Sequence, residues 1–193
     1  ILYYLGVRRG EALVLKWGDF DFTVDQVHIQ RDIDFTGSTA VDGTLKTEAA
    51  DRFVPIPEDL KVMLLPKRES ADAYVFHTPS GAPLPQASYK RMWSRLMVAC
   101  GCVTWREIKP GTSRPDDILK QVKPTLTPHY FRHNYVTLLY ESGIDPLVAM
   151  KIVGHTDYQT TANIYTHLKE DTLRRASVNM ERVFAKRSEQ DAQ

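Results

Sequence analysis

The chain has 193 residues, of which 42% are hydrophobic and 25% are charged, and its formal net charge is +1. This composition is typical of a soluble globular protein, and it excludes a membrane-spanning protein because no apolar run reaches the thickness of a bilayer. The two cysteines, Cys100 and Cys102, are too few for a zinc site and too close together to staple a fold, so we expect a cytoplasmic protein.

The N-terminal half of the chain mixes helical and strand patterns. A short helix is predicted over 11–18, and alternation of apolar and polar residues predicts a half-buried strand over 27–35. Residues 45–57 predict two short strands around a polar turn. Residues 58–67 predict a helix, and 74–81 predict a strand that runs into a Ser-Gly turn.

The C-terminal half is mostly helical. Residues 86–100 have the spacing of an amphipathic helix, whereas 101–124 are rich in Gly, Pro and charges and predict an irregular functional or mobile loop. Helices are predicted from Thr127 onward, with interruptions at Gly143 and Gly154. We therefore expect an α+β fold that is mainly helical, with a small antiparallel sheet or hairpin packed on a helical body.

Positive charge is concentrated in the middle of the chain. Residues 86–133 hold nine Lys or Arg against three Asp or Glu, a balance of +6, whereas 1–85 carry −4 and 134–193 carry −1. Such a block is typical of a solvated protein face and equally of a surface that binds phosphate groups. Composition alone leaves both interpretations open.

Three polar side chains stand in the first turn of the helix predicted after Thr127. Because His129, Arg132 and His133 follow at i, i+3 and i+4, they lie on one face, close to the amide groups of the helix start. One interpretation is helix capping at a solvated surface. A second is zinc binding by the two histidines, for which a third ligand and the Glu of an HExxH motif are missing. A third is a phosphate clamp.

Four other short motifs carry candidate site residues. "GVRRGE" contains Arg8 and, three positions later, Glu11. Lys46 lies in the predicted hairpin, His155 ends "VGH", and Tyr165 lies in "ANIYTH". Each of these residues alone is explained as well by surface solvation, helix ends or core packing.

Together, the motifs "GVRRGE", "LKTEAADRFVPIP", "HYFR", "VGH" and "IYTH" resemble, in order and spacing, the catalytic domain of the tyrosine recombinase (phage integrase) family. The family pattern is an Arg in a G-x-R-x-x-E box, a hairpin Lys, H-x-x-R, G-H and then a nucleophilic Tyr. The resemblance extends from Gly6 to Tyr165. It implies site-specific cleavage and rejoining of DNA through a covalent 3′-phosphotyrosyl intermediate, without metal, cofactor or ATP, in the integration or excision of a phage or mobile element.

The same resemblance implies six catalytic residues, which are Arg8, Lys46, His129, Arg132, His155 and Tyr165. Two arginines can present paired donors to the nonbridging phosphate oxygens, and each donor aimed at developing charge contributes about 3 kcal/mol. His129 would take the proton of the tyrosine, Lys46 would protonate the leaving 5′ oxygen, and His155 would donate to the phosphate. Glu11 would support the arginines, and His133 is expected to be structural.

The resemblance also implies partners and domains. We expect double-stranded DNA as the substrate and a helical DNA-binding domain upstream of Ile1, so that 1–193 is a catalytic-domain fragment. Residues 167–193 predict an amphipathic C-terminal helix or tail, which either packs on its own domain or links a homotetramer on paired DNA sites. We expect the protein at the bacterial nucleoid and not at a membrane.

Other functions share parts of this pattern. A type IB topoisomerase-like enzyme uses the same residue types but relaxes supercoils as a monomer, and a DNA-binding module could have lost catalysis altogether. A metal-dependent phosphodiesterase is a more distant alternative. The hairpin around Lys46 also carries Glu48 and Asp51, which are acidic for a loop expected to contact DNA.

Overall fold

The computed structural model describes residues 1–36, 39–43, 48–105, 122–155 and 165. Its α-helices are α1 (Leu2–Leu5), α2 (Arg9–Leu13), α3 (Glu58–Leu64), α4 (Gln86–Ala99), α6 (Pro128–Glu141) and α7 (Pro146–Val153), and its 3-10 helices are η1 (Trp17–Asp19), η2 (Glu48–Ala50) and η3 (Leu65–Lys67). Its strands are β1 (Phe20–Asp21), β2 (Gln26–Ile29), β3 (Asp32–Thr36), β4 (Thr39–Gly43), β5 (Arg52–Pro55), β6 (Val103–Trp105) and β7 (Val122–Pro124). These elements confirm the predicted class, a mainly helical α+β fold with small antiparallel sheets.

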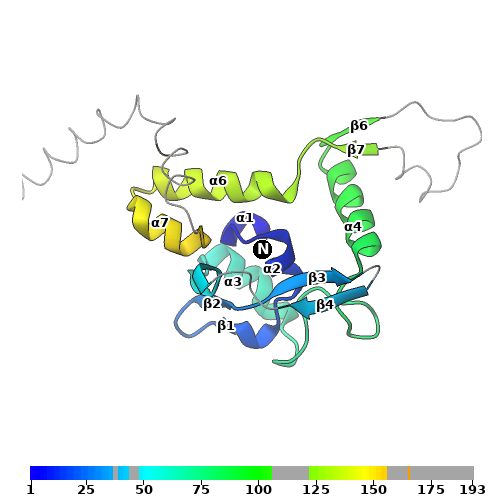
Figure 1. Cartoon of the computed structure of the whole chain (residues 1–193), viewed down its shortest axis with the longest axis horizontal. Helices are drawn as coiled ribbons and strands as arrows, with labels where there is room; N and C mark the ends of the chain where they lie inside the picture. The colour runs from blue at the N-terminus through cyan, green and yellow to red at the C-terminus, as the bar shows by residue number, and fades with distance from the viewer. Residues whose placement is uncertain (37–38, 44–47, 106–121, 156–164, 166–193) are drawn as a thin grey trace, which may run out of the picture.

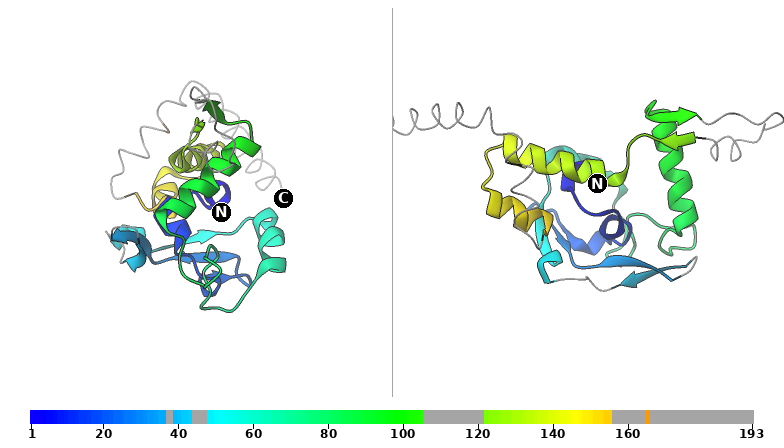
Figure 2. Two further views of the ribbon diagram at one scale, coloured as in Figure 1. Left: turned by 90° about the vertical axis from the view of Figure 1, so that its right-hand side faces the viewer. Right: turned by 45° about the horizontal axis from the view of Figure 1, so that its top comes forward.

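The two N-terminal helices lie between two layers. Figure 1 shows α6 above α1 and α2, α7 to the left of them, and strands β1 to β4 below them. Contacts of α1 with α6, of α2 with β3 and of α7 with β5 join these layers. Helix α4 packs on β7 and stands at the right-hand side of the molecule in Figure 1, so that it faces the viewer in the left view of Figure 2.

Apolar side chains form three clusters in the described part of the chain. The largest joins α1, η1, the β1-β2-β5 sheet and α3, and the second joins α6 and α7 with Tyr165. The third packs α4 against Leu13 and Phe131. Among the described residues, no helix combines the length and the apolar character needed to cross a membrane.

The first predicted helix is shorter than expected. It was predicted over 11–18 but ends at Leu13, and the chain continues into the 3-10 turn η1. The backbone amides of Trp17 and Gly18 donate to the carbonyls of Ala73 and Ala71, at 3.0 and 2.8 Å. Because a distant segment holds these amides, the helix cannot continue through them.

The single strand predicted over 27–35 is wrong, because the structure divides it into β2 and β3, which belong to different sheets. β2 lies between β1 and β5, and β3 pairs with β4, all antiparallel. Between β2 and β3, Gln30 donates to Oδ1 of Asp19 at 2.8 Å, and Arg31 forms an ion pair with the same carboxylate. These contacts hold the chain between the two sheets and interrupt the strand.

Two further strand predictions are corrected. Residues 45–57 contain one described strand, β5, which follows the 3-10 turn η2, while 44–47 lie outside the described residues. No described strand occurs within 74–81, where His77 forms only an isolated bridge with Pro83. Tyr74 likewise forms only an isolated bridge, with Lys16. The Ser-Gly turn predicted at the end of this segment is confirmed, because hydrogen bonds connect Thr78 to Gly81 and to Ala82.

The helices predicted over 58–67 and 86–100 are confirmed as α3 with η3 and as α4. The irregular loop predicted over 101–124 is wrong at its two ends, because β6 and β7 pair antiparallel there. Strands of three residues are too short to leave a periodic pattern in the sequence. Residues 106–121 lie outside the described residues.

The two helices that carry the H-x-x-R and G-H motifs are confirmed as α6 and α7. Gly143 and Gly154 have φ of +74° and +68°, as expected of residues that end helices. Asp145 caps α7 by accepting hydrogen bonds from the amides of Leu147 and Val148. The predicted C-terminal helix at 167–193 lies outside the described residues.

Candidate active site

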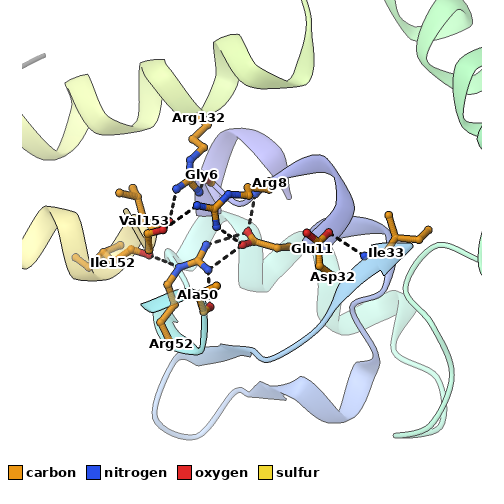
Figure 3. Close-up of polar contacts among 11 residues, drawn as sticks. Gly6, Arg8, Glu11, Asp32, Ile33, Ala50, Arg52, Arg132, Ile152 and Val153 are labelled. Atoms are coloured by element: carbon orange, nitrogen blue, oxygen red, sulfur yellow. Dashed lines mark hydrogen bonds and ion pairs between the residues drawn. The ribbon is translucent and has the colours of Figure 1, made fainter. Parts of the chain in front are cut away.

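Glu11 is the buried centre of an arginine cluster (Figure 3). It is 1% exposed and accepts hydrogen bonds from the Arg8 amide at 2.7 Å and from Arg8 Nη1 at 2.8 Å. Arg52 donates to the same carboxylate from Nη1 at 3.0 Å and from Nη2 at 2.9 Å. Burial raises the pKa of Glu11, but the hydrogen bonds and charge of Arg52, together with the hydrogen bonds of Arg8, hold it below its ordinary value. Glu11 is therefore an anion that fixes two guanidinium groups.

Arg132 is fixed by backbone carbonyls. It is 3% exposed, and it donates from Nη1 to the Gly6 carbonyl at 3.0 Å and from Nη2 to the Val153 carbonyl. Arg8 is braced in the same way, since its Nη2 donates to the Gly154 carbonyl at 2.8 Å. Burial and the charge of Arg8 lower the pKa of Arg132 to about 9, which leaves it protonated at neutral pH. A guanidinium has five N–H donors, and these contacts use only part of each set.

The two arginines open onto one pocket of about 470 Å³. Its lining residues come from the α1–α2 region, β3 and the start of α6, and they are Val7, Arg8, Arg9, Gly10, Asp32, Ile33, Thr127, Pro128, His129 and Arg132. Because α6 begins at this pocket, its first amide groups and the guanidinium groups favour an anion there. Of the interpretations left open by the sequence, this geometry favours the phosphate clamp.

Two histidines near the arginines, His129 and His155, have lowered pKa values. Burial, with the nearby His133 and Arg132, lowers the pKa of His129, and the rings of His129 and His133 pack edge to face with centroids 4.4 Å apart. Burial and the charges of Arg132 and Arg8 lower the pKa of His155 to about 4. At neutral pH His129 can therefore accept a proton. The described residues contain no group of three or more His, Cys, Asp or Glu side chains arranged to hold a metal ion.

The structure does not bring Tyr165 to the arginines. Its side chain packs on Tyr140 with ring centroids 4.9 Å apart, and its hydroxyl donates to the Ile144 carbonyl at 3.2 Å. Tyr140 lies eight residues beyond Arg132, which is roughly 12 Å along α6. Burial, with contributions from Asp145 and Tyr140, raises the pKa of Tyr165 to about 12. This environment holds the phenol protonated.

Of the six predicted catalytic residues, the structure brings Arg8, His129 and Arg132 to one pocket, and it places His155 within range of the charges of both arginines. Lys46 lies outside the described residues, and Tyr165 is held elsewhere. Of the two predicted arginines, Arg8 hydrogen-bonds to Glu11, whose other partner is Arg52. His133 contacts His129 at the exposed side of α6.

Sequence reasoning missed Arg52, which is nearly as buried as Arg132 and more buried than Arg8. A signal was present in "RFVP", because alternation in a strand puts Arg52 on the same face as Val54, and both are buried. A charged residue on the buried face of a strand needs a partner, which here is Glu11.

Two glycines of the motifs allow close packing around the cluster. A Cβ at Gly6 would lie 2.1 Å from the Tyr135 ring, and one at Gly154 would lie 2.9 Å from both the Ala49 carbonyl and Arg52 Cδ. Both glycines also have positive φ, which disfavours any other residue. The Gly6 carbonyl accepts the hydrogen bond from Arg132, and the Gly154 carbonyl accepts the one from Arg8.

Comparison with known proteins identifies the family of this chain. The phage integrase family matches residues 1–172, and the chain therefore belongs to that family. The tyrosine recombinase XerC-like protein of Caldanaerobacter subterraneus subsp. tengcongensis is 28% identical over 188 residues, covering 84% of this chain and 43% of that protein. Tyrosine recombinase XerC of Bacillus pumilus is 28% identical over 178 residues, covering 91% of this chain and 50% of that protein. The chain thus spans about half the length of these relatives.

Solved structures share the fold. The Tn1549 transposon integrase in complex with circular intermediate DNA matches with a TM-score of 0.65 and 24% identity, covering 94% of this chain and 57% of that one. The XerA recombinase matches with a TM-score of 0.55 and 24% identity, covering 93% and 55%. At this level of identity the similarity establishes the architecture of the chain.

Proposed function

We propose that this chain is the catalytic domain of a site-specific DNA recombinase, which cleaves and rejoins DNA through a covalent 3′-phosphotyrosyl intermediate. The observation that carries the proposal is the pocket in which Arg8, Arg132 and His129 converge at the start of α6. Family membership and the names of the relatives support it. The biological reaction would be the integration or excision of a phage or mobile element.

The arginines would bind the scissile phosphate. A phosphodiester carries one negative charge and gains more as a nucleophile adds, so donors that are already fixed stabilise the transition state most. Arg8 and Arg132 are fixed by Glu11 and by backbone carbonyls, and their remaining N–H groups are available to the nonbridging oxygens. Because guanidinium groups supply the positive charge, the proposed reaction needs no metal and no cofactor.

Proton transfer would use the surrounding side chains. His129, with its lowered pKa, is neutral at pH 7 and would accept the proton of the Tyr165 hydroxyl. Lys46 would protonate the leaving 5′ oxygen. His155 would donate a hydrogen bond to the phosphate, since a neutral imidazole keeps one N–H group.

Tyr165 would have to leave its observed position to react. Its hydroxyl is bonded to the Ile144 carbonyl and its pKa is raised to about 12, so the phenol is a poor nucleophile where it lies. In the pocket, the positive charges of the arginines would instead favour the phenolate. DNA binding would therefore accompany transfer of Tyr165 to the pocket.

The DNA would lie along α4 and across the pocket. Lys90, Arg91 and Arg95 are exposed on α4, within the block of positive charge found in the sequence. α4 adjoins the pocket through Arg9, whose guanidinium lies 5.5 Å from the ring of Tyr89. The Tn1549 integrase structure is a complex with DNA, which supports DNA as the partner of this chain.

Domain organisation and assembly remain part of the proposal. Residues 1–193 would form the catalytic domain, with a helical DNA-binding domain upstream and action at the nucleoid in the cytoplasm. The segment 167–193 would link protomers into a homotetramer on paired sites. Deleting residues from Asp171 onward should then leave half-site binding intact but weaken assembly of paired sites, and a truncated chain that unfolds would contradict this role.

Covalent capture tests the function without knowledge of the target site. Nicked DNA duplexes with a randomised stretch are incubated with the chain, and denaturing gels detect a protein–DNA adduct whose sequence gives the site. The wild-type chain should form the adduct in excess EDTA, and Tyr165→Phe should form none while it still binds and folds. An adduct with Tyr165→Phe would refute the assignment of the nucleophile, and no adduct with the wild type would refute the function.

A further inference from the structure

We propose that Arg52, outside the set of catalytic residues, is a positioning residue. It compensates the charge of Glu11, so that the positive charge of Arg8 stays available to the phosphate, and it fixes η2 and the end of α7, which precedes His155, to the Glu11 cluster. The proposal rests on the recombinase function proposed above. Arg52 is 7% exposed and comes from β5; in Figure 3 it lies below the Glu11 carboxylate, whereas Arg8 and Arg132 lie above it.

The guanidinium of Arg52 connects three segments that are far apart in the sequence. Nη1 and Nη2 form the paired contact with Glu11, at 3.0 and 2.9 Å. Nη1 also donates to the Ala50 carbonyl at 2.8 Å, and Nε donates to the Ile152 carbonyl at 2.8 Å. One side chain thus ties the G-x-R-x-x-E box to η2 and to the end of α7 (Figure 3).

The charge of Arg52 determines what Arg8 can do. Glu11 contacts both arginines, so two cations share a single anion. With Arg52 present, the pair of Arg52 and Glu11 is neutral and the positive charge of Arg8 remains for a phosphate. Without Arg52, Glu11 would neutralise Arg8 and would attract its guanidinium away from an anionic ligand.

The backbone contacts of Arg52 place two other segments. Ile152 belongs to the last turn of α7, and Gly154, which follows, lies so close that a Cβ there would be 2.9 Å from Arg52 Cδ. His155 is the next residue. On the other side, Ala50 ends the 3-10 turn η2, four positions beyond Lys46 in the sequence. Loss of Arg52 would release both segments from the cluster.

Lysine cannot replace Arg52 in this arrangement. The three acceptors lie around a planar fork, and a single ammonium group on a flexible stem cannot hold all of them in that geometry. Arg52→Lys therefore keeps the positive charge but no longer holds Glu11 and the two backbone carbonyls in place. Arg52→Met loses both the charge and these contacts. This difference separates the two parts of the proposed role.

The test compares single-turnover cleavage with binding on the duplex captured by the wild-type chain. Arg52→Met should cleave slower by about a hundredfold or more, and half-site binding should change little. Arg52→Lys should recover only a small part of the rate. The matched control is Arg31→Met, which breaks the ion pair of Arg31 with Asp19 outside the pocket and should cleave like the wild type below its melting temperature.

A double-mutant cycle tests whether Arg52 acts through Glu11. If it does, adding Arg52→Met to Glu11→Gln should slow cleavage much less than Arg52→Met does alone. The proposal would be overturned if the Arg52 variants cleaved DNA at a rate close to that of Arg31→Met. It would also be overturned if the rate defect of the double variant equalled the product of the two single-variant defects. Failure of both Arg52 variants to fold would make the residue structural and would also overturn it. A wild-type chain that forms no adduct would instead remove the proposed function itself.

Discussion

Replacement of Glu11 by Gln tests how strongly the arginine cluster is held together. The carboxylate accepts four hydrogen bonds, two at each oxygen, from the amide and Nη1 of Arg8 and from both Nη groups of Arg52. The amide of Gln keeps one oxygen, but its NH₂ group faces two of the former donors. The variant therefore loses two hydrogen bonds and the charge that balances a buried guanidinium.

The expected loss of stability is large for one substitution. Breaking a buried ion pair by removing one partner costs about 3–5 kcal/mol. For a domain of this size each kcal/mol lowers the melting temperature by about 2–4 °C, so Glu11→Gln should melt about 10 °C below the wild type. Thermal unfolding followed by circular dichroism and urea titration both measure this loss. A loss below about 1 kcal/mol, the value of an exposed ion pair, would refute the reasoning.

The pH dependence supplies a second check on Glu11. Burial raises the pKa of Glu11, but the combined lowering by Arg52 and Arg8 is larger, so the folded-state pKa lies below the ordinary value. A carboxyl of this kind stabilises the fold fully above its unfolded pKa of about 4.3, and the stabilisation is lost as the pH falls through the folded pKa. The stability gap between wild type and Glu11→Gln should thus be constant near neutrality and shrink in acid. An unchanged gap down to the pH of acid unfolding would contradict the ion pair.

Three further substitutions test other parts of the site. Arg132→Lys should slow single-turnover cleavage by about a hundredfold or more, because an ammonium cannot keep both backbone contacts and also face the phosphate; a near-normal rate would contradict the clamp. Lys46→Ala should be slow on ordinary DNA and largely restored by sulfur at the bridging 5′ position, whose leaving group needs no proton, and an equal defect on both substrates would exclude Lys46 as the acid. Gly154→Ala, at φ +68° and against Arg52, should cost about 1–2 kcal/mol or more in urea unfolding, and unchanged stability would argue against the tight packing there.

The sequence predicts best those elements whose signals are local. The helices α3, α4, α6 and α7 were expected, because periodic apolar residues and caps such as Asp145 act within a few residues of one another. The division of 27–35 into two strands was not expected, because it depends on hydrogen bonds to Asp19. The pairing of β6 with β7 depends on two short segments meeting across 106–121, which no local pattern records.

The residues of the candidate site also differ in how far the sequence predicts their positions. The convergence of Arg8, His129 and Arg132 was expected because the resemblance to the tyrosine recombinase family implied it, and the pocket contains all three. The contact of Arg52 with Glu11 was not expected, although the alternation of residues in the strand indicates that Arg52 lies on the buried face of β5. The place of Tyr165 follows from packing between α6 and α7 and has no counterpart in its own motif.

The proposed phosphate clamp and the proposed nucleophile differ in how ready they are to react. Arg8 and Arg132 are already held by a buried anion and by carbonyls, so the clamp needs little rearrangement to meet a phosphate. Tyr165 is not ready to react where it lies. Its hydroxyl donates a hydrogen bond to the Ile144 carbonyl, and the neighbouring Asp145 helps to raise its pKa. For the proposed reaction the phenol must exchange an acidic neighbour for cationic ones, which reverses the direction of its pKa shift. In the proposed reaction, the transfer of Tyr165 would determine reactivity, since the chemistry that follows would take place in a pocket that is formed beforehand.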